Sequence, residues 1–182
     1  MKTLTTIAAA VAILSASALA GPIKTNQVAG DANWVLHLDI AAMVQSGLGK
    51  FVISEAEKNT DYMNKTNELR KNFGFDLTKD VRGVTLYGKA LGDKQGVVIL
   101  DMTVDQTKVL ELIEANETHK TVKYGDHTLH TWQDKPKDGA DPDKPAKTNY
   151  GTFYDAKTVV AASSMDLLKH AVDVLDAKAD NM

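Results

Sequence analysis

The sequence contains no cysteine among its 182 residues. This excludes disulfide frameworks, zinc–thiolate sites, iron–sulfur clusters and cysteine nucleophiles. Proline is also scarce, with 4 residues, which excludes a collagen-like chain. The chain also lacks a large excess of one charge. It has 21 lysines and arginines and 24 aspartates and glutamates, which gives a net charge of -3. Proteins that bind nucleic acid carry a basic stripe or a high pI, so we expect no nucleic-acid partner.

The remaining composition is that of an ordinary folded protein. Hydrophobic residues make up 43% of the chain and charged residues 25%, close to the average of globular domains. A chain of 182 residues corresponds to one domain, at roughly 100–200 residues per domain. We therefore expect a single domain.

The start of the chain has the pattern of a secretory signal peptide. Lys2 supplies a positive charge, Ile7 to Leu14 form an apolar run, and Ala18 to Ala20 match an A-x-A cleavage site. The apolar run is shorter than the ~20 residues that a membrane-spanning helix needs. We therefore predict a signal peptide over 1–20, cleaved after Ala20. The exported protein would be periplasmic or extracellular, with no transmembrane segment after cleavage.

Residues 21–32 are small and polar and predict a flexible lead-in, followed by a single α+β domain over 33–182. Alternating apolar and polar residues indicate a strand, and apolar residues three and four apart indicate a helix. On these patterns we expect strands over 34–39, 81–91, 94–103, 119–124, 127–132, 150–154 and 157–162. Helices are expected over 48–73 (in two or three pieces), 105–117 and 164–177.

The first elements follow the order strand, helix, strand, strand, helix, strand, which is typical of the ferredoxin-like fold. We therefore predict an α+β fold with a ferredoxin-like (split βαβ) core. Its antiparallel or mixed sheet would have helices on one face and be extended by a C-terminal hairpin and helix. The apolar stripe of the last helix should be buried, namely Leu167, Leu168, Ala171 and Leu175. A segment rich in lysine, aspartate and proline, 134–149, predicts a solvated loop.

Metal and phosphate sites find little support in the sequence. His127 and His130 are close in sequence, but residues three apart on a strand point to opposite faces of a sheet. The H-E-x-x-H pattern is absent, and we expect no metal site and no cofactor. The sequence Gly-Leu-Gly-Lys at 47–50 lacks the earlier glycine and the following serine or threonine of a P-loop.

Three carboxylates fall at junctions between an expected strand and a helix: Asp39, Asp101 and Asp105. An aspartate at such a junction usually caps the helix N-terminus. Paired with other groups it can also take part in acid–base catalysis. The candidate catalytic residues are Asp101, His127 and His130, which would have to converge in the folded chain.

Four aromatic residues flank the expected loop: Tyr124, Trp132, Tyr150 and Tyr154. Aromatic side chains are enriched where proteins bind partners, so these four are candidates for a ligand pocket or a partner-binding patch. The alternative is that they belong to the core of the sheet.

Several motifs resemble those of exported bacterial α+β proteins of unknown function. In those proteins a strand ending in Asp-Leu, a "GFD-KD" turn and a "V-LYG" strand recur. The corresponding segments here are 34–39, 73–81, 84–88, 96–100, 124–127 and 172–176. The resemblance spans most of residues 33–177. It implies an α+β fold and export, and no reaction. Those proteins continue into a second α+β unit, so it also implies a short member or a truncated sequence.

These observations predict an exported, non-catalytic domain that binds a protein partner or a small ligand in the periplasm or at the cell surface. Two alternatives remain. The first is a hydrolase-like enzyme, whose candidate residues would meet in one concave site. The second is a carrier of a small apolar ligand, which would show a cavity that a close-packed core lacks.

Overall fold

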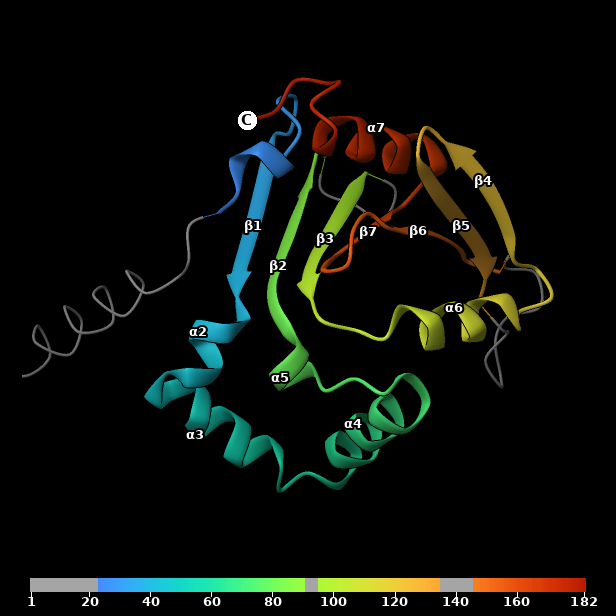
Figure 1. Ribbon diagram of the computed structural model, residues 1–182. Helices are drawn as coiled ribbons and strands as arrows, with labels where there is room; N and C mark the ends of the chain where they lie inside the picture. The colour runs from blue at the N-terminus through green and yellow to red at the C-terminus, as the bar shows by residue number, and fades with distance from the viewer. Residues whose placement is uncertain (1–22, 91–94, 135–145) are drawn as a thin grey trace, which may run out of the picture.

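The structure is a computed structural model that describes residues 23–90, 95–134 and 146–182 (Figure 1). The expected signal peptide, 1–20, and residues 91–94, where one expected strand ends and the next begins, lie outside the described residues. Residues 135–145, which make up most of the expected loop, lie outside them as well. Within these limits the chain forms one sheet and six α-helices.

The sheet has seven strands, and their order is β1-β2-β3-β7-β6-β5-β4. The strands are β1 (Trp34–Asp39), β2 (Val81–Gly88), β3 (Gly96–Met102), β4 (Lys120–Tyr124), β5 (His127–Gln133), β6 (Thr148–Phe153) and β7 (Thr158–Ala162). Every neighbouring pair is antiparallel. The α+β class and the antiparallel sheet are therefore confirmed.

The predicted split βαβ core is not confirmed. A split βαβ unit places another strand between the two strands that a helix connects. Here β1 pairs directly with β2 although four helices separate them in sequence. The last strand, β7, instead lies between β3 and β6 and joins the two halves of the sheet. The resulting sheet is larger than that of a simple ferredoxin-like fold.

The helices begin where the sequence supplies a capping side chain. They are α2 (Ile40–Gln45), α3 (Gly47–Ala56), α4 (Thr60–Phe73), α5 (Leu77–Asp80), α6 (Gln106–Glu114) and α7 (Met165–Leu175). Asp39 caps α2 by accepting a hydrogen bond from the backbone N–H of Ala42 at 2.8 Å. The segment expected as a broken helix over 48–73 forms α3 and α4, and Asn59 caps the second of these.

One face of the sheet packs against α7 and forms the core. Leu168 and Ala171 of α7 are both 0% exposed and pack with Leu129 and Val160 of the sheet. Full burial of a leucine contributes about 1.5–3 kcal/mol. The other two residues of the expected stripe, Leu167 and Leu175, are partly buried against the same cluster. The expected burial of the α7 stripe is therefore confirmed.

The segment expected as a flexible lead-in contributes to this core. Val28 and Ala29 are buried next to α7. Ala29 forms an isolated bridge with Asn181, and the Met182 N–H donates to the Val28 carbonyl at 2.9 Å. The sequence pattern missed this packing because two apolar residues are too few to show a period. The partner of this segment also lies at the far end of the chain.

The opposite face of the sheet faces α6, so helices lie on both faces and not on one. Along β3, Val97 and Ile99 belong to the α7 core, and the alternate residues Val98 and Leu100 point the other way. Leu100 and side chains of α6 line the same cavity. In Figure 1, α7 lies at the top of the strands and α6 below them. This second face positions the candidate site.

Candidate functional site

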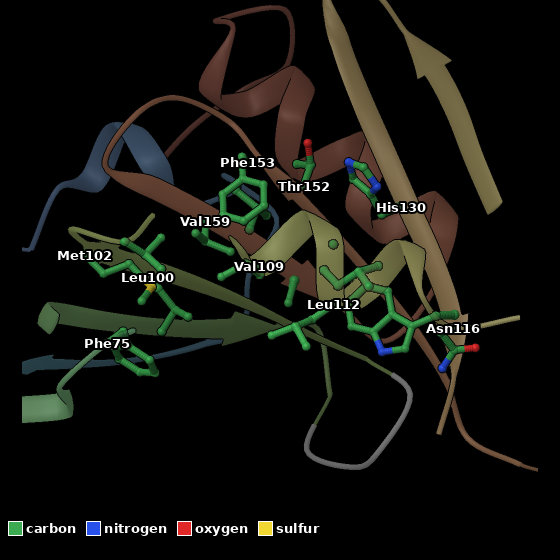
Figure 2. Close-up of a pocket in the computed structure, with 16 residues that line it drawn as sticks. Phe75, Leu100, Met102, Val109, Leu112, Asn116, His130, Thr152, Phe153 and Val159 are labelled. Atoms are coloured by element: carbon green, nitrogen blue, oxygen red, sulfur yellow. The ribbon is translucent and has the colours of Figure 1, made fainter. Parts of the chain in front are cut away.

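A cavity of about 510 Å³ lies between α6 and the sheet (Figure 2). Its sheet side is lined mainly by apolar residues of β3, β5, β6 and β7, and Phe75 closes it from the segment before α5. Ligand pockets typically measure about 300–1,000 Å³ and are predominantly apolar. The size and lining of this cavity are therefore those of a site for a small apolar molecule.

Two small residues in the middle of the sheet, Gly151 and Ala161, line the cavity. Strand pairing places Val98, Ala161, Gly151 and His130 in one row across β3, β7, β6 and β5. Of the two residues in the middle of this row, Ala161 carries only a methyl group and Gly151 has no side chain. A Cβ on Gly151 would lie 3.7 Å from the ring of Trp132. The Trp132 ring therefore lies directly beside the glycine and forms part of the wall.

The other wall of the cavity is α6. Its start is capped by Asp105, whose carboxylate accepts from the Lys108 N–H at 3.4 Å. Val109, Leu112 and Ile113 line the cavity from one face of this helix, as expected for residues three and four apart. Leu112 remains 42% exposed, so the cavity opens to solvent beside the helix.

A histidine pair supplies polar atoms at the cavity wall. His130 is only 7% exposed and lines the cavity. Its Nδ1 lies 3.0 Å from Nε2 of His119, and the two rings stack with centroids 5.3 Å apart. Burial lowers the pKa of His130, the nearby His119 lowers it further, and Glu114 acts in the opposite direction. His130 is therefore neutral at neutral pH.

The other polar side chains of the wall are already hydrogen-bonded within the protein. The Asn116 amide donates to the Gln133 carbonyl at 2.9 Å, and its oxygen accepts from the Thr118 N–H. The Thr152 hydroxyl donates to the Thr128 carbonyl at 2.8 Å. Within the described part of the chain, Nε2 of His130 has no hydrogen-bond partner.

The three candidate catalytic residues are held by separate sets of partners. His127 lies on the opposite face of β5 from His130, as the strand alternation predicted. It stacks on Tyr154 with centroids 4.8 Å apart and lies 3.2 Å from the carboxylate of Asp176. No cluster of three metal-binding side chains occurs among the described residues.

The third candidate, Asp101, lines a smaller cavity of about 300 Å³ near the start of α2. It accepts hydrogen bonds from Arg82 and from Lys24, the latter at 3.2 Å. Burial alone would raise the pKa of Asp101, but these two cations hold it below its ordinary value. Asp101 is therefore an ion-paired carboxylate, and it caps no helix.

The four candidate aromatic residues divide between the two faces. Trp132 lines the cavity, whereas the three tyrosines pack partly against the α7 core. Tyr124 donates to Asp173 at 2.6 Å and Tyr154 to Asp176 at 3.0 Å. Of the residues that line the cavity, only Trp132 and His130 were candidate site residues from the sequence. The apolar stripe of α6 was visible in the sequence, but what faces it was not.

No protein-family model matches this chain, and no match was found among curated proteins or solved structures. The class of the protein therefore follows from its architecture, an α+β protein with a seven-stranded antiparallel sheet and an apolar cavity under one helix. Within the described residues, none of the helices has the length and apolar character to span a membrane.

Proposed function

We propose that this chain is an exported, non-catalytic binding protein that holds a small apolar ligand between α6 and the sheet. The observation that supports it is the cavity of about 510 Å³ with its apolar lining. Protein interiors are normally close-packed, and an apolar cavity that opens to solvent is better filled by a ligand than by water. A hydrolase-like function has no comparable support, because Asp101, His127 and His130 are each engaged by different partners.

The small residues at the floor support a binding role. Gly151 and Ala161 occupy central strand positions, where larger residues would fill the space under α6. Glycine within a strand weakens it and often marks a place where another group approaches closely. In this protein the approaching groups are the Trp132 ring and, on our proposal, the ligand.

Binding is tested with N-phenyl-1-naphthylamine, whose fluorescence rises in apolar surroundings. Ala161→Phe fills the cavity and should weaken probe binding at least tenfold. Leu36→Ala is the matched control, because Leu36 lies on β1 outside the cavity lining and is 50% exposed. The proposal is wrong if the wild-type protein fails to bind the probe, or if Ala161→Phe binds it as tightly as the control.

A second measurement covers the case in which Ala161→Phe does not fold. The chain has 2 tryptophans, and Trp132 lines the cavity whereas Trp34 does not. In a Trp34→Phe protein the bound probe should quench the remaining emission more strongly than in a Trp132→Phe protein. Equal quenching in the two proteins would place the probe outside the cavity and contradict the proposal.

The export part of the proposal rests on the signal-peptide pattern of residues 1–20. N-terminal sequencing of protein recovered from the periplasm or medium of a bacterial host tests it. The expected first residue is Gly21. Protein that stays in the cytoplasm and begins at Met1 would contradict export without affecting ligand binding.

A further inference from the structure

We infer that the ligand is an uncharged alcohol or phenol whose hydroxyl group pairs with Nε2 of His130 while its apolar body fills the cavity. This inference rests on the proposed function and specifies its ligand class. It follows from three features of the cavity wall, namely the position of His130, the charges near it and its pairing with His119.

The first feature is the position of a single available polar atom. His130 is more than nine-tenths buried, lines the cavity, and uses Nδ1 in its contact with His119. Its Nε2 therefore remains as the hydrogen-bonding atom of the ring. A hydrogen bond between a ligand and the protein contributes about 0.5–1.5 kcal/mol in general. A ligand group that pairs with Nε2 would gain this contribution, whereas a purely apolar ligand would not.

The second feature is the charge around His130. Glu114 of α6 is an acidic group whose field acts on His130, in the direction opposite to that of His119. Lys123 of β4, on the same face as His130, donates to the Thr128 hydroxyl at 2.8 Å. Glu114 and Lys123 carry opposite charges, so together they offer a charged head group no net counter-charge. Because burial of an unpaired charge is costly, these surroundings favour an uncharged head group.

The third feature is the hydrogen bond between the two histidines, whose donor depends on the tautomer of each ring. When His119 donates to Nδ1 of His130, the Nε2 of His130 carries a hydrogen and donates. When Nδ1 of His130 is the donor, Nε2 accepts. A hydroxyl group both donates and accepts, so it satisfies Nε2 in either tautomer. A carbonyl or ether group satisfies only one tautomer. The histidine pair therefore suits a hydroxyl best.

The test compares ligands of one chain length in the wild-type protein and in His130→Phe. Decan-1-ol, 1-chlorodecane and decanoate each displace bound N-phenyl-1-naphthylamine. The affinity ratio of decan-1-ol to 1-chlorodecane should fall about tenfold in His130→Phe, the loss expected for one hydrogen bond. Decanoate should bind the wild-type protein more weakly than decan-1-ol. Comparing this ratio between the two proteins removes the difference in hydrophobicity between decan-1-ol and 1-chlorodecane, because that difference is the same in both.

Matched variants distinguish the loss of this hydrogen bond from a general loss of structure. His127→Phe changes the histidine on the opposite face of the same strand and should leave the ratio unchanged. His130→Gln keeps a hydrogen-bonding group at the site and should retain most of the wild-type ratio. If His130→Phe does not fold, the ¹⁵N chemical shifts of the His130 ring in the wild-type protein serve instead. They should move more with decan-1-ol than with 1-chlorodecane.

The outcomes distinguish this inference from the proposed function. If the probe does not bind the wild-type protein, the proposed function is wrong and the inference falls with it. If the probe binds but the ratio is the same in wild type and His130→Phe, only the hydroxyl inference is wrong. Tighter binding of decanoate than of decan-1-ol would also overturn the inference, because it would indicate an anionic head group.

Discussion

Nε2 of His119 lies 3.0 Å from Nδ1 of His130, and the two rings are stacked at a centroid distance of 5.3 Å. His119 lies between α6 and β4, whereas His130 lies on β5. The contact therefore connects the segment that follows α6 to the strand that forms the wall of the cavity. It also means that a second proton on this pair would place two positive charges next to each other.

The first prediction is a loss of stability on mild acidification. Burial and the neighbouring His119 lower the pKa of His130 below its ordinary value of 6.5. The unfolded chain therefore binds a proton at a higher pH than the folded chain, and the free energy of unfolding falls as the pH drops below about 6.5. Urea denaturation of the wild-type protein should show this fall between about pH 7 and pH 5.5.

The variant His130→Gln removes the titrating group and should give a shallower fall over the same interval. Above about pH 7 both states of the wild-type chain carry a neutral His130, so its pH slope should match that of the variant there. Identical slopes below pH 6.5 would contradict the assigned pKa direction of His130.

The second prediction concerns Asp176 at the end of α7. Its carboxylate accepts from Tyr154 at 3.0 Å and from Lys178 at 2.8 Å, and lies 3.2 Å from Nε2 of His127. Asp176→Ala leaves the partly buried Tyr154 and His127 without their acceptor, and the free energy of unfolding should fall by about 1–3 kcal/mol. Chemical denaturation measures the loss. Asp180→Ala, an exposed position nearby, should change it by less than about 0.5 kcal/mol.

Asp176 also links stability to pH in the acid range. The hydrogen bond from Lys178 lowers the pKa of this carboxyl, burial opposes the effect, and His127 and Tyr154 lower it further. A lowered pKa means that the stabilisation is present above the unfolded value of 3.8 and is lost as the pH falls through the folded value. The difference between wild type and Asp176→Ala should therefore shrink below about pH 4.

The third prediction contrasts two leucines. Leu168 is 0% exposed in the core under α7, whereas Leu48 in α3 is 74% exposed. Leu168→Ala should lower the free energy of unfolding by about 2–5 kcal/mol, through lost burial and the cavity left behind. Leu48→Ala should change it by less than about 0.5 kcal/mol. Similar losses in the two variants would contradict the assignment of the core to the α7 face.

The elements of this fold could be predicted because their signals are local. Alternation gave a strand over 127–132, and the structure has one at His127–Gln133. Three- and four-residue spacing gave a helix over 105–117, and the structure has one at Gln106–Glu114. The strand order could not be predicted in this way. The position of β7 between β3 and β6 depends on pairing between residues far apart in the chain.

The same limit applies to the site. Trp132 and His130 could be selected from the sequence by residue type alone. Aromatic side chains are enriched at binding sites, and histidine is a common acid–base group. Gly151 and Ala161 could not be selected. A small residue within a strand indicates a cavity only when its neighbours across the sheet are known. The cavity results from that juxtaposition, so no local pattern reports it.

The fourth prediction tests the floor of the cavity with the smallest possible change. A Cβ on Gly151 would lie 3.7 Å from the Trp132 ring, in ordinary van der Waals contact, and 3.3 Å from the Val160 carbonyl oxygen, which must shift slightly. The methyl group of Gly151→Ala therefore takes up space at the floor of the cavity beside the indole. Probe affinity should fall several-fold. Gly96→Ala on β3 is the control, because a Cβ there meets nothing within 4 Å. Unchanged affinity in Gly151→Ala, with the control equal to wild type, would show that the probe binds away from the row of small residues.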